Sequence, residues 1–118
     1  MTHPLEHAIT TRAIQIISTR ALRARETEAV DQSGRPCDPC APEAVRFCAV
    51  GALIRAAFEL TRAHERSHTL GWEIASKIAH HAGLTAGEDD PAYAITVLSD
   101  DRGQKAVLDT FGRYIARS

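Results

Sequence analysis

Apolar residues recur at helical spacing in several stretches of the chain. In the first stretch they stand four residues apart, which is the spacing of one face of an α-helix: Ile9, Ala13, Ile17 and Ala21. Pro4 suits the first helical turn, and Glu6 is favourably placed against the positive end of the helix dipole. The pattern predicts a first helix from Pro4 to about Arg25.

The second stretch is the most apolar part of the sequence. Over residues 43–62 nearly every side of a helix would carry an apolar residue, which is typical of a helix buried at the centre of a domain. Gly51 lowers helix propensity by about 1 kcal/mol, so we expect a neighbouring segment to approach it closely. The polar exceptions fall three or four residues apart and predict one solvent-facing stripe: Arg55, Glu59, Arg62 and Arg66.

Further helices are predicted toward the C-terminus. A break near residues 69–71 precedes a third helix over residues 72–82, and Gly83 has the properties of its left-handed cap. A short helix is predicted after Pro91. Asp101, with a glutamine three residues on, resembles a capping box at the start of an amphipathic last helix.

Residues 26–42 lack this periodicity. Residues 31–34, Asp-Gln-Ser-Gly, have the composition of a tight turn, and the residues on either side of them can form a short irregular hairpin. The prolines that follow exclude a regular element before the central helix: Pro36, Pro39 and Pro42. The sequence therefore predicts one all-α domain over residues 1–118. Four or five helices surround a buried central helix (about 43–62), with the short irregular hairpin before it.

Composition mainly excludes classes of function. The chain has 44% hydrophobic and 25% charged residues, as an ordinary globular domain has, and its net charge of −1 does not favour nucleic-acid binding or a polybasic membrane anchor. The first nine residues lack the layout of a signal peptide, and no apolar run approaches the roughly 18 residues of a membrane span. An odd number of cysteines, 3, without a secretion signal indicates a reducing compartment, which predicts a cytoplasmic protein.

Residues 64–68, His-Glu-Arg-Ser-His, match the zinc-hydrolase pattern His-Glu-x-x-His. On a helix, His64 and His68 would project on one face and could bind one zinc ion, while Glu65 deprotonates its bound water. The third ligand of the extended pattern falls at Ile74, which cannot coordinate metal, so another side chain would have to complete the site: His80, Glu73 or Glu88. We therefore expect a coincidental match and no cofactor, with zinc as the alternative.

Cys37 and Cys40 form a Cys-x-x-Cys sequence just ahead of the predicted central helix. A helix dipole would stabilise a thiolate there, but the βαβ surroundings of thioredoxin-like proteins are missing. Pairing these cysteines with His64 and His68 would need about twice the intervening chain of a usual zinc finger, which is about 12–15 residues. The sequence favours incidental thiols and leaves open whether they form a disulfide.

Cys48 lies within the most apolar stretch. A buried cysteine usually behaves as a small hydrophobic residue, and we expect this role for Cys48. The alternative is a catalytic thiol, with His80 or His81 as the base and Asp100 orienting it.

The block Phe47-Cys48-Ala49-Val50-Gly51-Ala52-Leu53 resembles the mark of a family of small bacterial and phage proteins of unknown function. That mark is a helix reading Ala-x-Arg-Phe-Cys-Ala-x-Gly-Ala-Leu, and a later family segment resembles residues 94–101. The chain departs from the family at residues 17–19, near the place of a Trp-Cys pair, and at residues 99–100, where the family has Asn-Asp. The resemblance implies the helical layout and brings no activity with it.

Together these observations predict a small, cytoplasmic, non-catalytic protein of the kind encoded by phages and accessory genomes. Its expected partner is another protein, with a homodimer as one form, and neither a membrane nor nucleic acid. The reasons are that no metal set is complete, no nucleophile has a credible base and no phosphate loop occurs in the sequence. Two rival classes remain: a zinc-dependent hydrolase using His64, Glu65 and His68, and a thiol enzyme using Cys48.

Overall fold

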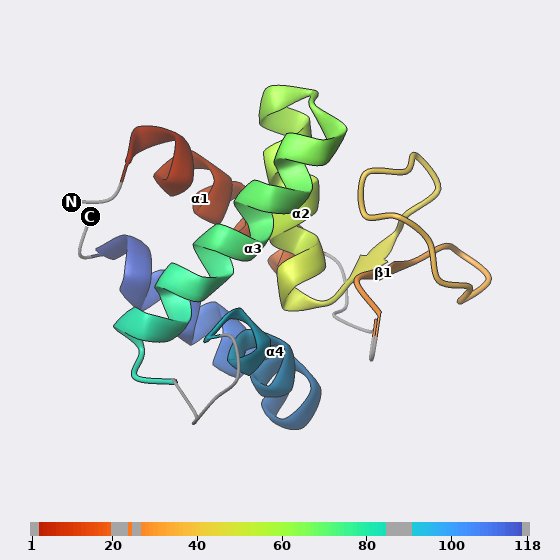
Figure 1. The fold of residues 1–118 in the computed structure, drawn as a ribbon. Helices are drawn as coiled ribbons and strands as arrows, with labels where there is room; N and C mark the ends of the chain where they lie inside the picture. Colours follow the sequence, from red (N-terminus) through yellow and green to blue (C-terminus); the bar gives the residue numbers. More distant parts are fainter. Residues whose placement is uncertain (1–2, 20–23, 25–26, 85–90, 117–118) are drawn as a thin grey trace.

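The computed structural model describes residues 3–19, 24, 27–84 and 91–116, without the side chains of Asp100 and Asp101. These residues form helices and one small antiparallel sheet (Figure 1): α1 (Pro4–Thr19), β1 (Ala29–Val30), β2 (Arg46–Phe47), α2 (Ala49–Thr61), α3 (His64–His81) and α4 (Pro91–Ala116). Helix α4 is two helices that meet at a kink at Gly103, where φ is 80°. The predicted all-α fold of four or five helices with a short hairpin is confirmed.

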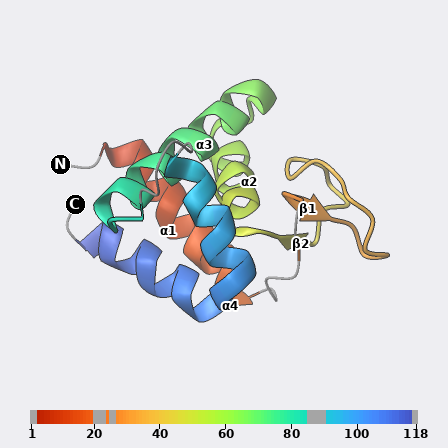
Figure 2. The ribbon, with the colours of Figure 1, turned by 60° about the horizontal axis from the view of Figure 1, so that its bottom comes forward.

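Helix α2 lies at the centre of the packing, mainly between α1 and α3. Its buried residues cover almost its whole circumference: Ala49, Val50, Gly51, Ala52, Leu53, Ile54, Ala56 and Ala57. Helix α4 packs against α3 and α1 (Figure 2). The start of α1 and the end of α4 lie at one end of the molecule, and the loop of residues 31–45 projects from the other end.

The central helix begins at Ala49, so its predicted start near residue 43 is wrong. Phe47 is buried as expected, but it belongs to β2 and pairs with Ala29 of β1. Cys48 is the N-cap of α2, and its Sγ accepts a hydrogen bond from the Gly51 N–H at 3.2 Å. A short apolar run looks the same in a buried strand and in a buried helix, which explains the error.

The predicted break at residues 69–71 is also wrong, because the chain turns at Arg62. Arg62 has a left-handed conformation with φ of 58°, and its N–H donates to the Phe58 carbonyl at 2.8 Å. Gly71 lies inside α3, where a Cβ atom would come within 2.4 Å of Cγ1 of Ile54. The glycine therefore serves the close packing of α3 on α2, and His64 stands in the first turn of α3.

Two glycine predictions are confirmed. A Cβ atom on Gly51 would lie 1.8 Å from the carbonyl oxygen of Glu28, so a neighbouring segment does approach this position. Gly83 has φ of 70° and follows the end of α3, where its N–H donates to the His80 carbonyl. Its left-handed conformation is the one that favours glycine.

Two further predictions concern the end of the first helix and the start of the last one. Helix α1 is described as far as Thr19, Ala24 is not helical, and the predicted end at Arg25 lies outside the described residues. The capping role of the Asp101 side chain also lies outside them. Gln104, its supposed partner, donates from its Nε2 to the carbonyl of Ile17 at 2.7 Å and so ties α4 to α1.

Candidate metal centre

The loop between β1 and β2 begins with the tight turn that the sequence predicts. Oδ1 of Asp31 accepts hydrogen bonds from the N–H groups of Ser33 at 2.9 Å and Arg35 at 3.0 Å. The Cys37 N–H then donates to the Ala29 carbonyl at 3.0 Å, which brings the returning chain alongside β1. The short irregular hairpin is therefore present, with β2 on the other side of β1.

Arg55 of α2 holds the next part of the loop against the helices. Its Nη1 donates to the carbonyls of Pro39 at 3.2 Å and Ala41 at 2.8 Å, and its Nε donates to Glu59 at 3.2 Å. Only 19% of its side chain is exposed, so the predicted solvent-facing stripe is wrong for this residue. Glu59 also pairs with Arg12 of α1 at 2.7 Å. Arg55 thus fixes the loop segment around Pro39 from a rigid helix.

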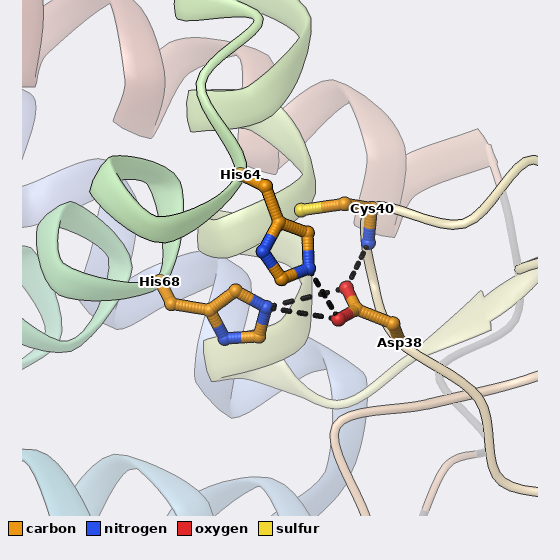
Figure 3. Close-up of side chains that lie close together, drawn as sticks. All are labelled: Asp38, Cys40, His64 and His68. Carbon is orange, nitrogen blue, oxygen red and sulfur yellow. Dashed lines mark hydrogen bonds and ion pairs between the residues drawn. The ribbon is translucent and has the colours of Figure 1, made fainter.

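The loop and the first turns of α3 bring four potential metal ligands together: Asp38, Cys40, His64 and His68. One ligand atom from each side chain lies within 4.8 Å of all the others. Nε2 of His64 lies 2.6 Å from Oδ2 of Asp38, and Nε2 of His68 lies 3.2 Å from Oδ1. Figure 3 shows the carboxylate facing both imidazoles, with the cysteine sulfur beside the His64 ring.

The local structure explains why these side chains converge. His64 and His68 are one helical turn apart, and their ring centroids lie 4.9 Å apart. Oδ1 of Asp38 accepts the Cys40 N–H at 2.8 Å, so the carboxylate and the thiol are held by one turn of the loop. Cys40 is 7% exposed, whereas 57% of the His64 side chain is exposed. The centre therefore has a buried sulfur side and an open histidine side.

Charge differs sharply between the two loop ligands. Burial raises the pKa of Asp38, but hydrogen bonds from the Cys40 N–H and from the two histidines outweigh it and lower this pKa to about 2. Burial, together with the nearby Asp38 charge, raises the pKa of the Cys40 thiol to about 12. Asp38 is thus a carboxylate at neutral pH, and the Cys40 thiol keeps its proton until a cation displaces it.

The donor set fits zinc. Thiolate sulfur, imidazole nitrogen and carboxylate oxygen are the ligand types of protein zinc sites. With bonds of about 2.0–2.3 Å, the ligand atoms of a tetrahedral site lie about 3.3–3.8 Å apart. The four atoms here lie within 4.8 Å of one another, so their largest separation exceeds that range by at most about 1 Å.

Neither His80 nor Glu73, two of the side chains that the sequence offers to complete the histidine pair, belongs to the group of four ligands. Ile74, at the position of the extended pattern, is fully buried in the core, and Glu73 is exposed on α3. Glu88 lies outside the described residues. The missing ligands come from the loop, as Asp38 and Cys40. The Cys-x-x-Cys segment is the sequence signal that points to these ligands. It is separated from the histidines by more residues than in a usual zinc finger, so the spacing does not reveal the site.

The redox interpretation of Cys37 and Cys40 finds no support in the geometry. They are separate thiols, and no helix begins directly after Cys40, since α2 starts at Ala49. Burial raises the pKa of both thiols, which opposes the thiolate that redox chemistry needs. Cys37 does not belong to the group of four ligands.

The structure does not bring His80 or His81 to Cys48, as the alternative of a thiol enzyme requires. His80 and His81 end α3, and the His81 ring packs edge-on against Tyr114, with ring centroids 5.7 Å apart. Cys48 instead lines a groove beside Trp72, more than two turns earlier in α3. The Asp100 side chain lies outside the described residues. The buried position expected for Cys48 is confirmed by its 3% exposure.

Substitutions of Cys48 test its N-cap role. Cys48→Ser is expected to leave the free energy of unfolding within about 1 kcal/mol of the wild type, because a serine hydroxyl at an N-cap accepts the same N–H. Cys48→Ala removes the acceptor and is expected to cost about 0.5–2 kcal/mol. Urea unfolding of both variants measures the difference. A serine variant less stable than the alanine variant would contradict the capping role.

Comparisons with protein-family models, curated proteins and solved structures each returned no match. The family resemblance of residues 47–53 therefore stays a prediction. Among the helices of the described residues, none combines the length and apolar character that crossing a membrane requires.

Proposed function

We propose that this protein is a small, non-catalytic, zinc-binding domain that acts by binding another protein. The observation that carries the zinc proposal is the convergence of Asp38, Cys40, His64 and His68, with their ligand atoms within 4.8 Å of one another. Zinc in this position cross-links the loop of residues 31–45 to α3. Such a link stabilises the folded chain, because the ligands are brought together only on folding.

The ligand count favours a structural zinc over a hydrolytic one. Four protein ligands fill a tetrahedral shell, whereas a catalytic zinc keeps one position for water. Glu65, the base of the alternative hydrolase, is exposed and does not belong to the group of four. The hydrolase using His64, Glu65 and His68 therefore ranks second.

A groove between α3 and α4 supports the protein-binding part of the proposal. Its walls include the aromatic residues Trp72 and Tyr93, which are 36% and 53% exposed, and its volume is about 330 Å³. Val97, one turn beyond Tyr93, is 41% exposed. Exposed aromatic side chains of this kind are enriched in protein interfaces. A second copy of the chain is one candidate partner for this groove.

Cobalt substitution tests the ligand set. Co²⁺ bound to the purified protein is expected to give the intense visible bands of tetrahedral cobalt and a near-ultraviolet thiolate-to-cobalt band, because Cys40 contributes sulfur. Cys40→Ala should lose the thiolate band, and Cys37→Ala, the matched control, should keep it. Weak octahedral bands in the wild type, or loss of the thiolate band in the control, would contradict the proposed centre.

A further inference from the structure

Glu28 lies between the metal centre and the groove, and its side chain faces both. Its Oε1 lies 3.9 Å from Nδ1 of His68, on the opposite side of the imidazole from the nitrogen that faces Asp38. Its Oε2 accepts a hydrogen bond from Nε1 of Trp72 at 3.1 Å. One carboxylate thus contacts a proposed zinc ligand and a wall of the groove.

The backbone of Glu28 is fixed independently of its side chain. Its carbonyl oxygen accepts a hydrogen bond from the Cys48 N–H at 3.1 Å. The same oxygen lies 1.8 Å from the position that a Cβ atom on Gly51 would occupy. Any residue at position 28 supplies that carbonyl. Because Gly51 has no side chain, the backbone at Glu28 can lie against the start of α2. This contact fixes the position from which the Glu28 carboxylate reaches α3.

We infer that Glu28 is the positioning carboxylate of the metal centre and that, through Trp72, it couples metal occupancy to the groove between α3 and α4. This inference rests on the proposed zinc binding and adds a regulatory link to it. A histidine that ligates zinc through one nitrogen commonly donates its other N–H to a carboxylate, which fixes the ring orientation and strengthens the ligand. Glu28 is the carboxylate beside the other ring nitrogen of His68: its Oε1 lies 3.9 Å from Nδ1, and the proposal requires this separation to shorten to a hydrogen bond when the metal is bound.

The coupling between the metal centre and Glu28 affects the surface of the groove. Glu28, Cys48, Trp72 and Tyr93 all line it, so a change in the carboxylate's contacts changes one wall of the groove directly. When zinc holds His68 in place, Glu28 is drawn to Nδ1 and the indole of Trp72 is held with it. When the centre is unloaded, the imidazole and the carboxylate are less constrained. The aromatic wall offered to a partner therefore depends on zinc.

Zinc affinity of Glu28→Ala, measured by competition with a chromophoric chelator, tests the positioning role. We expect zinc binding about 10- to 100-fold weaker than in the wild type. The matched control is Glu65→Ala, which removes an equal charge beside His64 from an exposed position and should bind zinc like the wild type. Circular dichroism should show both variants folded, since the backbone contacts of residue 28 do not need its side chain.

Trp72 fluorescence tests the coupling, and it is specific because the chain has 1 tryptophan. Zinc added to the metal-free wild type should change the emission, and saturating zinc added to Glu28→Ala should not. Equal zinc affinities in Glu28→Ala and Glu65→Ala, with the emission change retained in both, would overturn the role of Glu28 and leave zinc binding intact. A wild type that binds no zinc would overturn both proposals.

Discussion

Gly51→Ala is expected to lower the free energy of unfolding by about 3 kcal/mol or more, enough to unfold much of the protein. The added Cβ atom would lie 1.8 Å from the carbonyl oxygen of Glu28 and 2.8 Å from its carbonyl carbon. Both atoms belong to the backbone, so no flexible side chain can move aside. The gain in helix propensity on replacing glycine by alanine, about 1 kcal/mol, is too small to offset this clash.

Gly112→Ala is the matched control. Gly112 lies in α4, and a Cβ atom there would meet nothing within 4 Å. Helix propensity then acts alone, so the control is expected to be as stable as the wild type or more stable by up to about 1 kcal/mol. Urea unfolding of the two variants measures the contrast. A Gly51→Ala variant with wild-type stability would mean that Glu28 does not pack against α2.

Metal removal has the second large expected effect. Stripping the protein with a chelator should lower its free energy of unfolding by about 4 kcal/mol relative to protein in free zinc at a thousand times the dissociation constant. The melting temperature should fall by on the order of 10 °C. The physical reason is that the proposed zinc site exists only in the folded chain, where Asp38 and Cys40 lie beside the histidines.

The double substitution His64→Ala with His68→Ala separates the contribution of zinc to stability from that of the histidine side chains themselves. In chelator, the variant should be nearly as stable as the wild type, because partly exposed ion pairs such as His64–Asp38 contribute about 0–1 kcal/mol. In zinc, the variant should gain no stability. His80→Ala with His81→Ala, at the other end of α3, should respond to zinc like the wild type.

The sequence predicts the helical architecture well because it depends on local features. The spacing of Ile9, Ala13 and Ile17 predicts α1, and all three residues are buried. Gly51 in an apolar helix predicts a close neighbour, and Gly83 predicts a cap. In each case the signal and its structural consequence lie within a few residues of each other.

The helix boundaries were missed where tertiary contacts decide them. Phe47 continues the apolar pattern of α2, but its backbone pairs with Ala29, from which the whole loop separates it in sequence. Arg62 has the left-handed conformation that usually marks glycine, so nothing in its residue type predicts the turn. Gly71 looked like a break and instead makes room for Ile54.

Only the histidine half of the candidate metal centre is visible in the sequence, and the sequence analysis takes that match as coincidental. His64 and His68 are visible as a pair because one helix turn brings them together. Asp38 and Cys40 reach them from the loop that Arg55 holds against α2, and this contact joins residues 14 and 16 positions apart in sequence. The zinc-finger spacing rule misses such a site because the intervening chain contains β2 and the whole of α2.

Elemental analysis of the gel-filtered protein tests the central claim most directly. Protein produced with zinc in the medium, passed through gel filtration and analysed for metals should contain one equivalent of zinc per chain. The double variant His64→Ala with His68→Ala should contain none, and the control pair His80→Ala with His81→Ala should keep its equivalent. A folded wild type without zinc, or a double variant that retains it, would contradict a zinc centre at Asp38, Cys40, His64 and His68.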